Sequence, residues 1–462
     1  MAESCHLFTN AKSESHMNSE SSLLHQLNNK NLSLDEKAEL RCQLAKQYEE
    51  IGQYEAARQA MGELWQRIGE RPKIEDLELR TAAEVLLRVG ALTSSIGICN
   101  QIEGAQETAR NLITESLTVF QSFKYGKKIA EAQTELARCY FREGRYDEAR
   151  ITLQDALSRL NTDSELKALA ILRSAVVEWG ATKYKEALNI LIEAAPLFEK
   201  INKQVIKGSY HNQLAIMYQT FAEQGQKEYL DPSFIEYEAA SYYFEQAEHK
   251  QYLANVENNL GFLFFTAGKY KEAHNHLEHA RRLMLSLKDR VNAARVDETR
   301  AKIFLAQRRN VEAEKAAKSA VSILEQNQHH SLAEALITHG IALARIRNYE
   351  YARFTLYRAI EISLQSGAAN RAGEAALAII QELGGHLEEL KSLSSKLPLV
   401  KELRRYEHDL IKEALISVGG RVSHAARLLR TSHQYLAYVI EHRYKDLIAL
   451  RTPVKTRRKR NQ

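Results

Sequence analysis

The stretch YFREGRYDEA, residues 140–149, has two close relatives in the same chain. YEEIGQYEAA starts at Tyr48 and FFTAGKYKEA starts at Phe264. In every copy an aromatic residue is followed by Gly, Tyr and Ala at fixed offsets, and a small residue stands three positions before the aromatic. A small side chain lets two antiparallel helices cross closely, with an aromatic of the partner helix beside it. The pattern therefore predicts a repeated helical hairpin.

Weaker copies of this pattern occupy most of the remaining sequence. The alanines of their second helices, Ala240, Ala273, Ala313 and Ala352, recur at intervals of about 33 to 40 residues. One hairpin cannot bury its apolar face alone, so neighbouring hairpins must stack. These residues resemble the tetratricopeptide repeat. The resemblance implies an all-α fold, a tetratricopeptide-type superhelix of helical hairpins.

The composition agrees with a nearly all-helical protein. Only five prolines occur in 462 residues, of which 44% are hydrophobic and 27% charged. The abundance of Ala, Leu, Glu, Lys and Arg favours helices, and the length is ample for a core. Residues 1–22 show no basic region followed by an apolar one, so we do not expect export, and we find no run of about 18 apolar residues that could span a membrane. We therefore expect a cytoplasmic protein without membrane contact.

Motifs for catalysis and for cofactors are missing from the sequence. It has no GxxxxGKS or GxxxxGKT loop for nucleotide phosphates and no HExxH. The cysteines, Cys5, Cys42, Cys99 and Cys139, lie too far apart for metal or redox spacing. Nothing assembles a nucleophile, a base and an orienting group. We predict a protein that is not an enzyme and that holds no metal or cofactor.

The first helix of each hairpin would line the concave face of the superhelix. An Asn amide there can both donate to and accept from a peptide backbone, and a basic side chain suits a carboxylate. These side chains would otherwise be solvated polar groups on an exposed face. The candidate residues for a peptide or protein partner are Arg138, Arg142, Asn212, Gln219, Asn255, Asn258, Phe262, Lys302 and Arg345.

A different pattern follows the repeats. The segment GGHLEELKSLSSKLPLV contains glycines, serines and Pro398, which indicate a linker. Three apolar-periodic segments then follow, of which the second is only about two helical turns long, and Ser432 is a favourable N-cap for the last of them. Two helices, a tight turn and an alanine crossing predict a small helix-turn-helix domain. The predicted segments are a disordered polar tail (1–31), the repeats (32–385), a linker (386–399), the helix-turn-helix domain (400–450) and a disordered basic tail (451–462).

The last domain resembles the Fis-type helix-turn-helix. The matching positions are Glu407, Ile411, Ala414, Leu415, Gly420, Ser423, Ala425, Ala426, Leu429, Ser432 and Leu436. The resemblance implies binding of double-stranded DNA, usually as a dimer, with the third helix in the major groove. Arg430 replaces the family's turn glycine, and His433 and Tyr435 replace its usual recognition residues, so the target sequence stays open. The candidate DNA contacts are Arg421, Ser423, His424, Arg427, Ser432, His433, Gln434, Tyr435, Tyr438, Arg443, Lys445, Arg457, Arg458, Lys459 and Arg460.

The charge distribution favours the same end of the chain. The whole chain has a formal net charge of +5, whereas residues 397–462 carry 15 Lys and Arg against 6 Asp and Glu. A basic end on a mildly acidic body is typical of polyanion binding. We therefore predict a transcription regulator that contacts duplex DNA and is associated with the bacterial nucleoid when bound to it. The repeats would bind a partner or a ligand, or form a homodimer. The alternative is a protein-interaction scaffold whose C-terminal hairpin caps the repeats.

Overall fold

The structure is a computed structural model, and every regular element in the residues it describes is a helix. The chain divides into two compact units, residues 1–303 and residues 304–462. The described residues are 22–29, 31–99, 102–327, 331–366, 368–383, 398–429 and 431–452.

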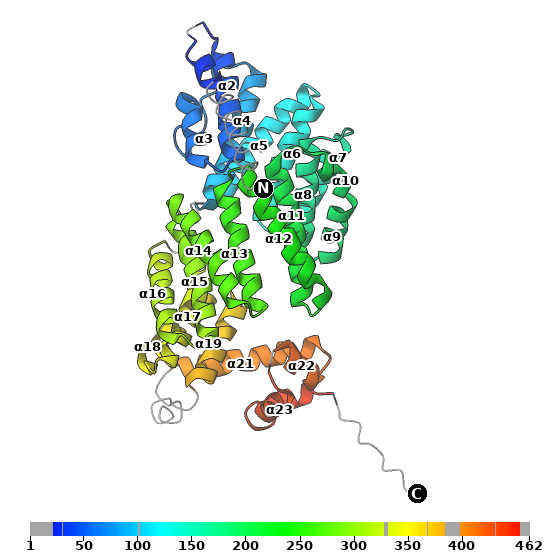
Figure 1. The fold of residues 1–462 in the computed structure, drawn as a ribbon. Helices are drawn as coiled ribbons and strands as arrows, with labels where there is room; N and C mark the ends of the chain where they lie inside the picture. Colours follow the sequence, from blue (N-terminus) through cyan, green and yellow to red (C-terminus); the bar gives the residue numbers. More distant parts are fainter. Residues whose placement is uncertain are drawn as a thin grey trace. The chain divides into compact units, whose positions relative to one another are not determined.

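Antiparallel helices follow one another through the first unit (Figure 1). They are α2 (Leu34–Glu50), α3 (Tyr54–Met61), η1 (Gly62–Leu64), α4 (Leu79–Cys99), α5 (Ala105–Ser122), α6 (Gly126–Arg142), α7 (Tyr146–Ser158), α8 (Glu165–Gly180), α9 (Tyr184–Glu193), α10 (Ala195–Lys200), α11 (Gln204–Glu223), η2 (Lys227–Tyr229), α12 (Leu230–Gln246), α13 (Lys250–Thr266), α14 (Tyr270–Ser286) and most of α15 (Arg290–Ala306).

The second unit continues with further hairpins and then changes character. Its elements are α16 (Asn310–Gln326), α17 (Leu332–Arg345), α18 (Tyr349–Gln365), α19 (Ala369–Leu383), α21 (Pro398–Ser417), α22 (Val422–Leu428), α23 (His433–His442) and η3 (Lys445–Leu450).

The turn of each clear repeat passes through the left-handed backbone region. Gly52, Gly144 and Gly268 have φ angles of 75°, 74° and 75°. Lys124 and Thr182, in weaker copies, also have positive φ, 54° and 62°. A side chain in this region costs roughly 1–2 kcal/mol. The turn geometry therefore persists where the sequence has lost the glycine, which is why those copies are weak in sequence but regular in structure.

Small residues mark the helix crossings, as predicted, but the partner differs from the expected one. A Cβ on Gly261 would lie 2.5 Å from Cγ of Leu277, so α13 and α14 approach too closely for any side chain there. Gly340 meets Leu356 at the same distance. Only some crossings, such as Gly208 against the ring of Phe244, use an aromatic partner. The predicted aromatic partner is therefore present at Gly208, whereas leucine fills the same space at Gly261 and Gly340.

The turn between α2 and α3 contacts residues far along the chain. Nζ of Lys203 lies 2.6 Å from a carboxylate oxygen of Glu50. Gly52 approaches the ring of His249 so closely that a Cβ would lie 2.7 Å from its Cε1. His249 is buried, and burial lowers its pKa to about 4. The first hairpin therefore packs directly against the turns before α11 and α13.

The predicted polar tail of residues 1–31 ends earlier than expected. Residues 22–27 are helical, and Leu23 and Leu27 pack against the first apolar cluster of the unit. Two hydrophobic side chains four residues apart on one helix face are sufficient for this contact. Residues 1–21 lie outside the described residues.

The predicted basic tail also begins inside the fold. Arg451 pairs with Glu441 at 2.8 Å, and the backbone N–H of Thr452 donates to the carbonyl oxygen of Gly420. The prediction that residues 451–462 do not pack was therefore wrong for its first two residues. Residues 453–462 lie outside the described residues.

Helix α4 contains a stretch, Leu79–Ile98, that is long and apolar enough to cross a membrane by length and composition. This stretch differs from the prediction that no apolar run is long enough to span a membrane. Within the structure 89% of this stretch is buried. That is the environment of a core helix, since neighbouring helices cover its apolar surface.

Helices α21, α22 and α23 pack around an apolar cluster of their own. Leu415 of α21, Ala425 of α22 and Ile440 of α23 are fully buried in it. Helix α21 begins at Pro398, inside the segment 386–399 that was predicted as a linker, and residues 384–397 lie outside the described residues. The side chain of Ser432 accepts from the backbone N–H of Tyr435 at 3.1 Å, which is the predicted N-cap.

Candidate functional site

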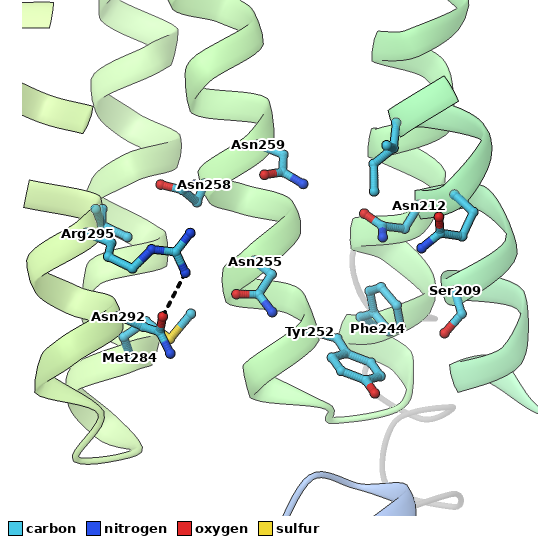
Figure 2. A pocket seen from close by; sticks show the side chains of 13 residues that line it. Ser209, Asn212, Phe244, Tyr252, Asn255, Asn258, Asn259, Met284, Asn292 and Arg295 are labelled. Carbon is cyan, nitrogen blue, oxygen red and sulfur yellow. Dashed lines mark hydrogen bonds between the residues drawn. The ribbon is translucent and has the colours of Figure 1, made fainter. Parts of the chain in front are cut away.

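A pocket of about 450 Å³ opens between helices of the first unit (Figure 2). Three walls of side chains surround it: one from α11, one from α13 and one from α15. Figure 2 shows the asparagines of α13 in the middle, between side chains of α11 and α15. Met284 of α14 and Phe244 of α12 complete the lining.

Amide side chains dominate this pocket. On α13 they stand three and four residues apart, which places them on one helical face. An amide offers both a donor and an acceptor, so such a face can pair with alternating N–H and C=O groups. The amide residues that line the pocket are Asn212, Gln213, Asn255, Asn258, Asn259 and Asn292.

Two of these amides carry unsatisfied oxygens. Oδ1 of Asn212 and Oδ1 of Asn258 are buried, and neither has a hydrogen-bond donor among the described residues. A buried acceptor without a partner costs roughly 1–3 kcal/mol. A ligand that donates N–H groups would offset this cost.

The pocket carries a single positive charge and no carboxylate among its lining residues. Arg295 is exposed, and its guanidinium donates to Oδ1 of Asn292 at 3.0 Å. Tyr252 closes one side and stacks on the buried ring of His249, with ring centroids 3.8 Å apart. The pocket is therefore neutral to weakly cationic, with amides on its walls and aromatic rings beside them.

Comparison with known proteins identifies the repeat fold. Residues 124–171 match a sequence family described as tetratricopeptide repeat. The solved structure of the apo form of RapI is 14% identical, covers 79% of this chain and 100% of its own, and superposes with a TM-score of 0.52. The chain has a tetratricopeptide-type repeat fold.

Two further solved structures are similar to this tetratricopeptide-type protein. A Rap protein complexed with Competence and Sporulation Factor is 12% identical, with 78% of this chain and 99% of that chain covered and a TM-score of 0.45. Aspartyl phosphate phosphatase F from Bacillus subtilis is 12% identical, with 77% and 91% covered and a TM-score of 0.48. No curated protein matches the sequence.

Of the predicted groove residues in this tetratricopeptide-type chain, Asn212, Asn255 and Asn258 come together in the pocket. The sequence prediction missed their neighbours. Asn259 adjoins a predicted residue, and Asn292 and Arg295 lie in the next hairpin, three residues apart. The amide-rich composition of α13 was the available signal for Asn259.

Arg138 was predicted to face a partner, and the structure shows it paired internally. Its guanidinium lies 3.0 Å from Glu135 and 3.9 Å from Glu49, and it donates to Oγ of Ser95. Burial alone would raise the pKa of Glu135, but the guanidinium groups of Arg138 and Arg173 lower it well below its usual range. Arg138 therefore belongs to an ion network between hairpins, and its prediction as a groove residue was wrong.

The other predicted groove residues lie outside the pocket. Gln219 donates to Glu223 and accepts from the hydroxyl of Tyr237, so the neighbouring helix already uses its amide. Other contacts of this group join Lys302 to Glu298 at 3.1 Å, Arg345 to Glu382 at 2.8 Å, Phe262 to the ring of Phe265, and Arg142 to the ring of Phe141.

The predicted DNA contacts of the second unit are exposed wherever the structure describes them. Arg443 nevertheless pairs with Glu407 at 2.8 Å. Residues 457–460, and Arg430 in the turn, lie outside the described residues. The exposed candidates are Arg421, Ser423, His424, Arg427, Ser432, His433, Gln434, Tyr435, Tyr438, Arg443 and Lys445.

Within the described ranges, no three His, Cys, Asp or Glu side chains gather in a way that could hold a metal ion.

Proposed function

We propose that the protein is a cytoplasmic, non-enzymatic interaction scaffold that binds an extended peptide segment in the asparagine-lined pocket. The observation that carries this proposal is the set of amides on α11, α13 and α15 that face one cavity. An extended peptide presents N–H and C=O groups in alternation, and amides can pair with both. The unsatisfied oxygens of Asn212 and Asn258 would accept from its N–H groups.

The size and charge of the pocket support the same ligand class. A volume of about 450 Å³ lies within the usual range of ligand sites, roughly 300–1,000 Å³. Recognition of the backbone by neutral amides tolerates many side chains, so specificity would come from Tyr252 and Arg295, which also line the pocket.

The test is selection of binders from a random peptide library on the full chain. We expect enriched peptides whose affinity falls about tenfold when Asn258 is changed to alanine. Asn310→Ala is the matched control, because Asn310 also has a buried unsatisfied Oδ1 but lies outside the pocket. Selection without enrichment, or peptides that Asn255→Ala/Asn258→Ala binds equally well, would refute the proposal.

A second function is proposed for α21, α22 and α23: binding of double-stranded DNA. Its support is an apolar cluster separate from the repeats, together with exposed His433 and Gln434 in the first turn of α23. Amide side chains at such positions can bond adenine edges. In a homodimer, the two copies of α23 would have to reach major grooves about 34 Å apart, and a peptide in the repeats could alter this spacing.

A gel-shift assay at low salt with duplex DNA tests this second function. His433→Ala/Gln434→Ala should weaken sequence-preferring binding about tenfold, whereas Lys412→Ala, an exposed lysine on α21, should lose only slight salt-dependent affinity. If the wild-type protein shows no DNA affinity, the second function is refuted. The scaffold function would still stand, because the peptide assay does not depend on DNA binding.

A further inference from the structure

A second cavity, of about 530 Å³, lies inside the unit of residues 304–462. One wall is α19, with Leu377 and Ile380, and another is α21, with Leu410. The start of α23 closes it with Tyr435 and Leu436. We call this cavity the α19–α23 groove.

Large apolar side chains are left open to solvent in this groove. Leu377 is 38% exposed, Ile380 is 43% exposed and Tyr435 is 40% exposed. An apolar stripe on a surface helix normally packs against a neighbour. Here α19 and α23 present such side chains to the same hollow and leave a volume between them. An apolar body that entered would cover all three.

The polar groups of the groove are unbalanced in charge. Glu407 accepts from Arg443 at 2.8 Å and from the hydroxyl of Tyr444, so the Glu407–Arg443 pair is neutral and satisfied. Arg404 also lines the groove and is exposed. No carboxylate in the part of the chain that the structure describes lies within ion-pair distance of Arg404. Among the described residues, the lining therefore carries one positive charge, Arg404, without an ion-pair partner.

We propose that the α19–α23 groove binds a small amphipathic anion: an apolar body with one carboxylate or similar group. The apolar part lies between Leu377, Ile380 and Leu410, and the anionic end meets Arg404. The volume suits a small molecule, and a guanidinium at the edge of an apolar site is a strong partner for a carboxylate. This site is separate from the asparagine-lined pocket and needs neither proposed function.

The position of the groove gives such a ligand a consequence. Ser432, the N-cap of α23, and Tyr435 both line it, and both are candidate DNA contacts. A bound molecule would cover these side chains from the α19 side. Occupancy would therefore reduce DNA affinity if α23 contacts DNA.

The experiment uses two fluorescent probes on the full chain. 1-Anilinonaphthalene-8-sulfonate has an apolar body and one negative charge, and N-phenyl-1-naphthylamine is its uncharged counterpart. We expect saturable binding of one sulfonate probe per chain. Ala376→Trp, which fills the groove, should weaken both probes about tenfold or more, and Arg404→Gln should weaken the sulfonate about fivefold and leave the neutral probe unchanged. Leu364→Ser, at a 50% exposed leucine outside the groove, should change neither.

Several outcomes would overturn the proposal. If Ala376→Trp binds both probes as tightly as the wild type does, the probes bind elsewhere. If Arg404→Gln weakens both probes equally, the groove has no preference for an anion. Probe binding that vanishes as the chain dimerises shows that a second copy fills the groove. Should Ala376→Trp fail to fold by circular dichroism, Leu377→Gln decides instead, with an expected loss of about threefold for both probes because Leu377 is partly exposed.

Discussion

Asn258 and Arg138 differ in how the rest of the chain contacts their polar groups. Both lie on the first helix of a hairpin and both were predicted to face a partner. Arg138 is paired with Glu135 and Glu49 of the chain itself. Asn258 keeps a buried oxygen without a donor among the described residues. Asn258 also lines an open pocket, whereas Arg138 makes ion pairs with neighbouring helices, so we take an amide that faces a pocket as the stronger sign of a binding site.

The largest expected effect comes from breaking the ion network around Arg138. Arg138→Ala leaves Glu135 buried among fewer cations, and removal of one partner of a buried pair typically costs about 3–5 kcal/mol. We expect a fall of this size in the free energy of unfolding. Tryptophan fluorescence during denaturation measures it, because Trp65 and Trp179 both lie in this unit.

Under conditions in which the Arg138→Ala variant is folded, its peptide affinity should equal that of the wild type, because Arg138 does not line the pocket. If Arg138→Ala lowers the free energy of unfolding by less than about 1 kcal/mol, the network is solvated like a surface salt bridge.

Lowering the pH should destabilise the fold in two steps, first through His249 and then through the ion network around Glu135. Burial lowers the pKa of His249 to about 4, below an unfolded value of about 6.5. The unfolded chain therefore binds more protons, and stability falls as the pH drops from about 6.5 to 4, by up to roughly 3 kcal/mol. Denaturation midpoints measured between pH 7 and pH 4 test this, and His249→Asn, which keeps a side-chain acceptor for the Tyr252 N–H, should flatten the profile.

The ion network should respond at lower pH. The pKa of Glu135 is lowered in the fold, so its contribution is complete above the ordinary carboxyl pKa of about 4 and is lost as the pH falls further. Glu135→Gln should remove this acid loss while the His249 loss remains. A single acid transition that neither variant alters would contradict the assignment of two separate windows.

The smallest expected effect on stability belongs to the pocket. Asn258→Leu removes a buried oxygen that has no donor, so we expect a change in stability within about 1 kcal/mol, in either direction. Peptide affinity should fall at least about tenfold in the same variant. Strong destabilisation by Asn258→Leu would show that its amide is structural, like Arg138.

The repeat pattern predicted the hairpins and their crossings, because Gly and Ala positions report helix packing directly. It placed Asn255 and Asn258 on the helix face that lines the pocket, since both follow from the offset of the first helix within one repeat. It could not foresee the partner of Arg138, because Glu49 stands 89 positions earlier and only the fold brings it close. Asn292 and Arg295 were missed for a related reason: the copy of the repeat at α15 is weak, and Lys302 was chosen on the same helix instead.

In the C-terminal helices, too, the buried positions could be predicted from the sequence and the site could not. Their buried positions follow from apolar periodicity, so the cluster of Leu415, Ala425 and Ile440 was predictable. The α19–α23 groove was not, because it depends on side chains of α19 and α23 that no sequence pattern links.

N-methylation of a selected peptide tests the binding of a peptide backbone by the asparagines most directly. Replacing single backbone N–H groups by N–CH₃ removes donors and leaves the side chains intact. We predict that one or two positions lose about tenfold in affinity, and that Asn258→Ala abolishes the sensitivity at one of them. A peptide whose affinity depends only on its side chains, with no penalty from N-methylation at any position, would contradict recognition by the asparagine-lined pocket.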